Sequence, residues 1–266
     1  MIDDPKSARV KGVVRLHQKD ARSQTGLFLL EGPQGLKELV REPDLALEVF
    51  ATSGALSKFA SEFESLRKAR VEIIEVSEAV LEKMADTQNP QGVVAVLKQL
   101  DVDLADLLET SPVLVAVLEQ VRDPGNAGTV IRAADASGAD GVVLTKESVD
   151  LYNSKLVRST AGSLLNIPTV SEVEPRDLLE SLRAAGVQIY VADAGGDLLT
   201  DISREELAKP TAWVFGNEAH GVSALARELS DRVVALPIYG SAESLNLATA
   251  ASVCLYASAF AQRATH

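Results

Sequence analysis

Three polar segments in the second half of the chain each follow a run of apolar residues and carry side chains that could do chemistry. The first is EQVRDPGNAGTVIR, residues 119–132. Its Asp-Pro-Gly sequence is typical of a turn. Asn126 would then lie near the start of a helix, where free backbone N–H groups favour an anion. Arg132 lies further along the same helix, where it could have a functional role or simply pair with Asp135 on the helix surface.

The second polar segment is FGNEAHGVS, residues 215–223, and it is typical of a strand-to-helix turn. Glycine at 216 and at 221 would let the backbone turn sharply and approach a ligand. Ser223 could cap the helix that follows. His220 could act as a catalytic base, although a histidine in a loop is more often an exposed side chain without a catalytic role.

The third polar segment is LPIYGSAESLNLA, residues 236–248, and a long apolar helix is expected to begin near Leu245. Ser244 is well placed either to cap this helix or to line a binding site. Asn246, at the start of the helix, could equally form a hydrogen bond with a neighbouring loop.

The elements that would position these segments alternate between strand and helix, which is typical of an α/β protein. Continuous apolar runs predict strands that are buried on both faces of a parallel sheet, at 113–118, 141–144, 187–192, 212–215 and 233–236. Helices are expected at 127–137, 154–164, 175–185, 224–229 and 245–262. Because ligands bind beyond the carboxyl ends of the strands in such a sheet, the polar segments mark its binding edge.

The first hundred residues predict a smaller α/β unit. Its strands are expected at 27–30, 47–51, 71–76 and 93–97, and its helices at 34–41, 56–70 and 77–84, with Ser77 as an N-cap. A polar, acidic stretch at 98–112 is typical of a linker with one short helical turn. We therefore expect two domains, residues 1–105 and residues 106–266.

The net charge of −12 argues against a protein that coats nucleic acid non-specifically, because phosphate neutralisation needs lysine and arginine. Residues 1–30 differ from the rest, since six Lys and Arg against three Asp give them a charge of +3. This segment is either a solvated helix or an arm that contacts RNA.

Other classes of protein are disfavoured by what the sequence lacks. It has one cysteine, Cys254, so neither a disulfide within the chain nor a zinc site of paired cysteines is expected. It has no signal-peptide core and no uncharged apolar run of the roughly 18 residues that a membrane helix needs, so we expect a cytoplasmic protein. The second half of the chain lacks GxGxxG, P-loop and HExxH motifs, which disfavours a Rossmann-type oxidoreductase that uses a nicotinamide cofactor and an ATP enzyme of the usual motif type.

Taken together, in this order and at these separations, the three segments resemble the SpoU (TrmH-type) family of RNA 2′-O-ribose methyltransferases in the SPOUT superfamily. The strings that match are DPGNAGTVIR (123–132), FGNEAHGVS (215–223) and LPI…ESLNLA (236–248). KLVRSTAG (155–162) is similar to a further family segment, and GLFLLEG (26–32) resembles the family's ribosomal-protein-like substrate-binding domain. The layout is similar to that of the thiostrepton-resistance type of rRNA methyltransferase.

The resemblance implies an α/β fold in which a SPOUT-type parallel sheet with a deep trefoil knot follows a small N-terminal substrate-binding domain. General topology rules make knots very rare, so the knot is implied by the family alone. The resemblance also implies a homodimer whose catalytic pocket is completed across the interface, and a bound S-adenosyl-L-methionine without any metal. The residues implied to hold or shape the cofactor pocket are Gly216, Gly221, Leu236, Pro237, Ile238 and Leu245.

The same resemblance implies catalytic roles for five polar residues. Arg132 would lie at the ribose hydroxyl and an adjacent phosphate; because a guanidinium is a poor base at neutral pH, we favour a role in binding the phosphate and stabilising negative charge over a role as a base. Asn126 would orient Arg132 or the ribose, and Glu218 would position Arg132 or its loop. Ser244 and Asn246 would line the methyl-transfer pocket.

The RNA is expected to bind basic residues that cluster on one face together with Arg132. An rRNA substrate fits the sizeable N-terminal domain better than a tRNA substrate, by analogy of fold. A tRNA ribose methyltransferase and a non-catalytic RNA-binding module on the same fold are the alternatives. The residues expected to contact RNA are Arg15, Lys19, Arg22, Arg122, Lys155 and Arg158.

Overall fold

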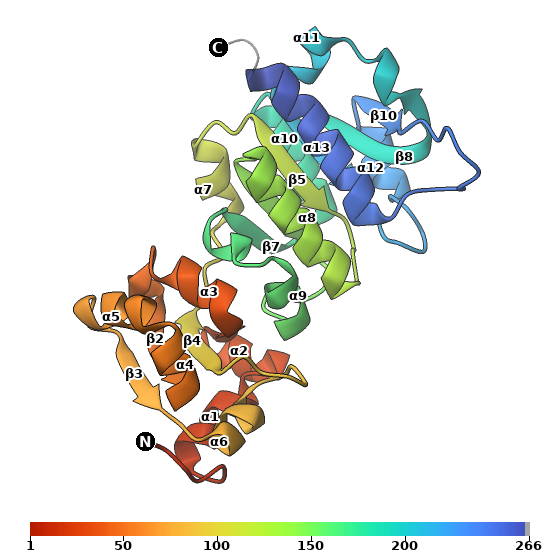
Figure 1. Ribbon diagram of the computed structural model, residues 1–266. Coiled ribbons are helices and arrows are strands. Elements are labelled where there is room, and N and C mark those ends of the chain that lie inside the picture. Colours follow the sequence, from red (N-terminus) through yellow and green to blue (C-terminus); the bar gives the residue numbers. More distant parts are fainter. Residues whose placement is uncertain (264–266) are drawn as a thin grey trace. The chain divides into compact units, whose positions relative to one another are not determined.

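The computed structural model describes residues 1–263 and divides the chain into two compact units, each shown in Figure 1. The first unit consists of Met1–Leu100 and Tyr152–Leu165. The second consists of Asp101–Leu151 and the chain from Asn166 onward. A single boundary near residue 105 does not describe this division, because Tyr152–Leu165 interrupts the second unit in the sequence but belongs to the first.

The first unit is built on a four-stranded sheet in the order β1 (Leu27–Glu31), β4 (Val93–Lys98), β2 (Ala46–Ala51), β3 (Glu72–Glu75). β4 runs antiparallel to both β1 and β2, while β2 and β3 are parallel. The expected helix at 56–70 is interrupted at Phe59, which separates α4 from α5 in a non-helical conformation. The helices are α1 (Ala8–Arg15), α2 (Lys19–Thr25), α3 (Gly32–Leu39), α4 (Ser53–Lys58), α5 (Ala60–Lys68), α6 (Glu78–Met84) and α9 (Ser154–Ser159).

The basic N-terminal segment is helical and partly buried. α1 places Val10 and Val13 in a hydrophobic cluster with Phe50 of β2 and with side chains of α6. Its exposed face therefore carries the charges, while its apolar face belongs to the core of the first unit.

The inserted segment Tyr152–Leu165 is held in the first unit by apolar and ionic contacts. The ring of Tyr152 lies 4.7 Å from that of Phe28, centroid to centroid. The guanidinium of Arg158 lies 3.4 Å from a carboxylate oxygen of Glu31 and 3.1 Å from one of Asp86. The expected helix at 154–164 is shorter than predicted, since α9 ends at Ser159.

The second unit is built on a six-stranded, fully parallel sheet, as expected for this α/β class. Its strand order is β10 (Arg232–Ala235), β8 (Gln188–Leu198), β9 (Thr211–Phe215), β5 (Leu114–Leu118), β6 (Gly141–Thr145), β7 (Thr169–Val173). Five of these strands were predicted from their apolar runs. β7 was not predicted, because it is an edge strand whose polar residues give it no continuous apolar run.

Helices cover both faces of this sheet. α10 and α12 share a hydrophobic cluster with inward-facing side chains of β5, β8 and β9. α8 and α13 lie side by side on the other face, where the indole of Trp213 donates to Ser258 Oγ at 2.9 Å (Figure 1). The helices of this unit are α7 (Leu104–Glu109), α8 (Pro124–Ser137), α10 (Pro175–Ala184), α11 (Arg204–Leu207), α12 (Ala224–Leu229) and α13 (Leu247–Arg263).

β8 and β10 pair in two pieces, and the break between them shapes the binding edge of the sheet. Val233 lies opposite Val191, but the next residue, Val234, lies opposite Asp197. Residues 192–196 of β8 are therefore not paired with β10. A Cβ at Gly196 would lie 2.3 Å from the backbone of Val233, so only glycine fits where the two strands close again. Among the described residues, no helix is long and apolar enough to cross a membrane.

Candidate active site

The loops after β5 and β9 meet because these strands are neighbours in the sheet. Glu119, at the end of β5, is only 3% exposed, and its carboxylate accepts hydrogen bonds from the backbone N–H (2.8 Å) and the hydroxyl (2.6 Å) of Ser223. Asn217 donates to the carbonyl oxygen of Gln120 at 2.8 Å. Sequence reasoning did not single out Glu119, although a carboxylate directly after a fully buried strand was an available signal.

Glycine is required at positions 216 and 221 of the 216–223 loop for two different reasons. A Cβ at Gly216 would lie 2.3 Å from backbone atoms of Gly221 and Val222. Gly221 itself has a φ of +69°, which side chains other than glycine rarely adopt. Asn217 and Gly221 exchange backbone hydrogen bonds of 2.9 and 2.8 Å, so the loop is a tight, closed turn.

Glu218 projects from this turn onto the N-terminus of α8. Its carboxylate accepts from the backbone N–H groups of Arg122 (3.4 Å) and Asp123 (3.3 Å) and from the side-chain amide of Asn126 (3.3 Å). Asp123 is the N-cap of α8 and accepts from the N–H of Asn126 at 2.7 Å. The partial positive charge of the helix start favours the carboxylate at this position.

Asn246 joins the third polar segment to the same network. Its amide donates to the side-chain oxygen of Asn126 at 2.9 Å, and its own oxygen accepts from the N–H groups of Ala248 (2.9 Å) and Thr249 (3.4 Å). Asn246 therefore caps α13, and the alternative in which Ser244 caps it is wrong, because the helix begins two residues later than expected, at Leu247. Glu218, Asn126 and Asn246 form one hydrogen-bonded chain that joins the three polar segments.

A pocket of about 480 Å³ opens beside this chain. That volume suits a small organic ligand. Five of the six residues expected to hold the cofactor line it, and Pro237 does not. Ala192, Asp193 and Ala194, from the part of β8 that is not paired with β10, line it as well, and they were not predicted from the sequence. The expected residues that line the pocket are Gly216, Gly221, Leu236, Ile238, Leu245, Asn126, Glu218, Ser244 and Asn246.

Arg132 lies apart from the pocket lining. It is exposed on α8, six residues after Asn126, and within residues 1–263 its side chain has no hydrogen bond or ion pair. The alternative pairing with Asp135 is therefore not formed in the described part of the chain. The guanidinium is free to bind an anion.

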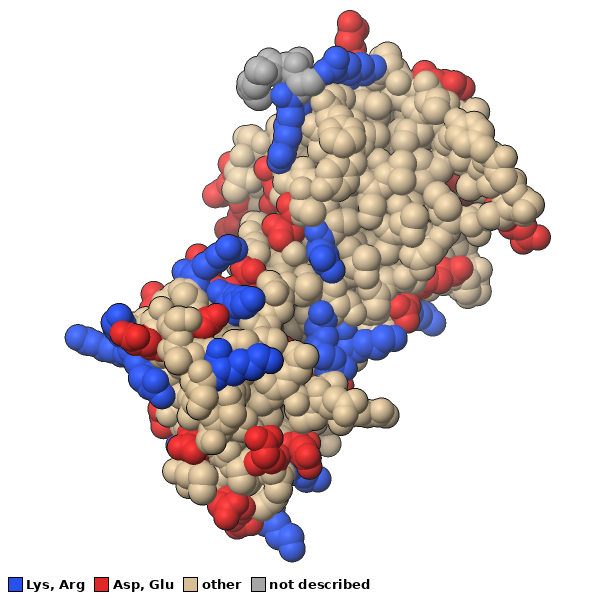
Figure 2. All heavy atoms as spheres, viewed as in Figure 1, with Lys and Arg blue, Asp and Glu red and all other residues tan. Residues whose placement is uncertain are grey.

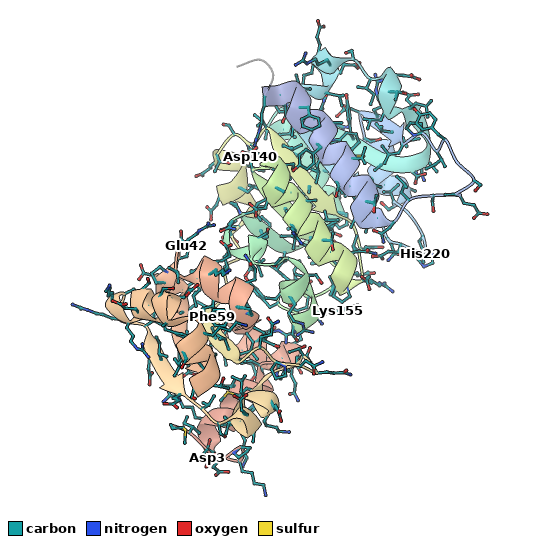
Figure 3. All side chains as sticks on the ribbon, in the orientation of Figure 1. Asp3, Glu42, Phe59, Asp140, Lys155 and His220 are labelled. Atoms are coloured by element: carbon teal, nitrogen blue, oxygen red, sulfur yellow. The ribbon has the colours of Figure 1, made fainter. Side chains whose placement is uncertain are left out.

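His220 lies at the exposed tip of the 216–223 loop and does not line the pocket (Figure 3). Its backbone N–H donates to the side-chain oxygen of Asn217 at 3.2 Å. Nothing in this arrangement points the ring at the pocket. No group of three or more His, Cys, Asp or Glu side chains in residues 1–263 could hold a metal ion.

The residues expected to contact RNA differ in accessibility. Arg22 is only 4% exposed and donates to the carbonyl oxygen of Leu16 at 2.8 Å, so its burial contradicts a direct contact with RNA. Arg158 is engaged by two carboxylates of the first unit. Arg122 is exposed and lies 3.5 Å from Glu147. Arg15, Lys19 and Lys155 are exposed, and Figure 3 labels Lys155 on α9.

Models of known families match both halves of the chain. The model of the SpoU rRNA Methylase family matches residues 113–256, which is more than half of the chain. The model of the MRM3-like substrate binding domain matches residues 7–95.

Similar proteins match over nearly their whole length. The chain is 34% identical over 256 residues to the 23S rRNA (guanosine(2553)-2′-O)-methyltransferase RlmP of Bacillus subtilis, covering 96% of this chain and 97% of that protein. The SpoU methyltransferase AviRb from Streptomyces viridochromogenes, solved in complex with AdoMet, has a TM-score of 0.82 and 32% identity, covering 96% and 97% of the two chains. An AdoMet-bound rRNA methyltransferase from Sinorhizobium meliloti has a TM-score of 0.83 and 28% identity, covering 97% and 96%.

Proposed function

Since this chain belongs to the SpoU rRNA methylase family, we propose that it methylates a ribose 2′-hydroxyl of RNA with S-adenosyl-L-methionine. The observation that carries the proposal is the hydrogen-bonded chain of Glu218, Asn126 and Asn246 beside a pocket of cofactor size. The relatives that are named as 23S rRNA ribose methyltransferases support rRNA as the substrate.

The pocket fits the proposed cofactor. Its wall combines apolar side chains, such as Leu236, Ile238 and Leu245, with Gly216 and Gly221 and with polar side chains from several segments. This is the usual composition of a site for a nucleoside-containing ligand. S-adenosyl-L-methionine supplies a methyl group that its sulfonium already activates, so the protein needs no metal to do so.

The residues of the chain would then act by positioning. Glu218 holds Asn126 against the start of α8, and Asn246 holds it from the other side, so that these amides can fix a ribose at the pocket mouth. Arg132 would bind the adjacent phosphate and stabilise negative charge on the 2′ oxygen. Because arginine is a poor base, the proton would leave to phosphate or water.

We further propose a homodimer, in which the partner completes the pocket. α13 exposes Val253 (44%) and Phe260 (69%), and Figure 2 shows a broad surface over α8 and α13 with few charged side chains. Arg132 is exposed on α8, outside the pocket of its own subunit. A second copy seated on this face would cover the apolar side chains and take up the free guanidinium.

The knot, the RNA-binding role of residues 1–105 and the cytoplasmic location are also part of this proposal. The split pairing of β8 and β10 is compatible with a chain that threads a knot at this edge. The match to a substrate-binding domain supports an RNA-binding role for residues 1–105, with Arg15 and Lys19 exposed for it. An rRNA substrate supports a cytoplasmic enzyme.

The test is ribose-methylation mapping of rRNA and tRNA from cells with and without the protein, complemented by wild type, Arg132→Ala or Arg132→Lys. One rRNA position should lose methylation without the protein and regain it only with wild type. Arg132→Lys should remain strongly impaired, because lysine lacks the planar fork that grips phosphate.

Binding of S-adenosylhomocysteine to purified Arg132→Ala should match wild type, because Arg132 does not line the pocket. If Arg132→Ala lost methylation and cofactor binding equally, the proposed role of Arg132 would be wrong. A methylated tRNA position in place of an rRNA position would identify a tRNA enzyme. Unchanged methylation of all RNA would favour a non-catalytic RNA-binding module.

A further inference from the structure

The pocket wall carries three carboxylates and no basic side chain. Asp193, Glu218 and Glu243 line it, whereas none of its described lining residues is a lysine, arginine or histidine. The three carboxylates come from separate segments, namely the part of β8 that is not paired with β10, the loop after β9 and the loop before α13. The pocket as a whole is therefore an electronegative cavity.

Two of these carboxylates, Glu218 and Glu243, have no lysine or arginine partner within residues 1–263. Glu218 is bonded by backbone N–H groups and by the neutral amide of Asn126, not by a cation. Glu243 is exposed and has neither a hydrogen bond nor an ion pair with any residue in 1–263. Both are therefore available to act on a charged ligand.

Asp193 differs because it is held in place. Its side chain is 18% exposed and pairs with Arg227 of α12, and it also accepts from the N–H of Gly195 at 3.3 Å. A Cβ at Gly221 would lie 3.4 Å from the Asp193 carboxylate, so the loop after β9 passes directly beside it. Arg227 orients Asp193 and offsets part of its charge, but does not itself line the pocket.

On the basis of the proposed function, we infer that the three carboxylates distinguish the methyl donor, S-adenosyl-L-methionine, from the product, S-adenosylhomocysteine, by charge. S-adenosyl-L-methionine carries a sulfonium and an ammonium against one carboxylate, for a net charge of +1. S-adenosylhomocysteine has almost the same shape but a neutral thioether, for a net charge of zero. An electronegative wall therefore favours the donor and weakens retention of the product.

The expected size of the effect follows from Coulomb's law. A carboxylate about 8 Å from the extra positive charge, at an effective dielectric constant of about 60, changes the relative affinity by about threefold. The effect should fall as salt rises, because the pocket opens to solvent.

The experiment measures dissociation constants for S-adenosyl-L-methionine, S-adenosylhomocysteine and sinefungin by calorimetry, on wild type, Asp193→Asn, Glu243→Gln and Arg227→Gln. Sinefungin carries an amine in place of the sulfonium and so keeps the positive charge. Asp193→Asn and Glu243→Gln should each lower the donor-to-product preference about threefold. Arg227→Gln should raise it, because it unmasks Asp193.

The opposite sign of Arg227→Gln separates charge from general damage, since a merely distorted pocket loses affinity for all three ligands alike. Glu109→Gln is the matched control, because Glu109 lies on α7, which contacts β7 at the opposite edge of the sheet from β10. It should leave the preference unchanged.

A preference that is the same in wild type and in all pocket variants would overturn this inference while leaving the proposed function intact. Failure of wild type to bind either adenosyl ligand would instead overturn the proposed function. Sinefungin that follows the product in place of the donor would also overturn the inference, because its charge is that of the donor.

Discussion

Asn246 has two separable tasks. Its side-chain oxygen caps α13, while its side-chain amide donates to Asn126. A cap alone would be satisfied by several residue types, including aspartate. The bond to Asn126 needs a donor, because Asn126 presents its oxygen. Sequence alone could not separate these tasks, since both fit an asparagine that precedes an apolar helix.

We predict that Asn246→Asp keeps the stability of the protein but loses most of its methyl-transfer activity. The carboxylate still caps α13, but it faces the Asn126 oxygen without a proton to donate. Asn246→Ala should lose the same activity and also about 1 kcal/mol of unfolding free energy. Urea denaturation and single-turnover methylation measure the two quantities. Full activity in Asn246→Asp would show that only the cap matters.

At the scale of elements, α9 depends on an ionic contact with carboxylates of its own unit. Burial opposes the ionisation of Asp86, but the hydrogen bond and charge of Arg158, together with a hydrogen bond from Ser154 and the charge of His17, hold the pKa of Asp86 below its ordinary value. A lowered pKa contributes stability that is present above the ordinary value and is lost as the pH falls through the folded-state value. The contact should therefore hold at neutral pH and fail in acid.

The corresponding prediction concerns amide hydrogen exchange of residues 152–165. Protection, corrected for intrinsic exchange rates, should stay constant at neutral pH and decrease below about pH 4. Asp86→Asn should already show reduced protection at pH 7 and a smaller further decrease in acid. Glu180→Gln, which removes an exposed helix ion pair with Arg176, serves as control and should leave this segment unchanged. Protection in Asp86→Asn equal to wild type would contradict the anchoring role.

At the scale of the whole molecule, the proposed dimer makes catalysis a shared property. If Arg132 acts on the partner's pocket, two inactive subunits can complement each other, because each supplies what the other lacks. An Arg132→Ala subunit keeps Asn246, and an Asn246→Ala subunit keeps Arg132. Their heterodimer then holds one complete site and one site with both defects.

We predict that co-expressed Arg132→Ala and Asn246→Ala subunits recover about one quarter of wild-type activity, since half of randomly formed dimers are mixed and each has one complete site. Each variant alone should be inactive in the same methylation assay. Absence of recovery, with mixed dimers verified by differential tags, would place Arg132 on the pocket of its own subunit. If light scattering showed that the wild-type protein is a monomer, the proposed dimer would be refuted.

The sequence by itself determined the class of the fold and the positions of the polar loops. Continuous apolar runs such as 113–118 and 212–215 are typical of strands that are buried on both faces, so β5 and β9 were predicted from the sequence pattern alone. The glycines at 216 and 221 were likewise recognisable as turn residues, because the requirement for glycine is local to the backbone. β7 was not predicted, because an edge strand needs no continuous apolar run.

The tertiary structure alone decided which side chains meet and which are withdrawn. The Asn126–Asn246 bond joins residues 120 positions apart, and the Glu119–Ser223 bonds join residues 104 apart. No local pattern encodes such distances. The same holds for Arg22, a basic residue in a basic segment that the core buries. Propensity and turn chemistry act over a few residues, whereas the site is made by strand order, which depends on the packing of the entire sheet.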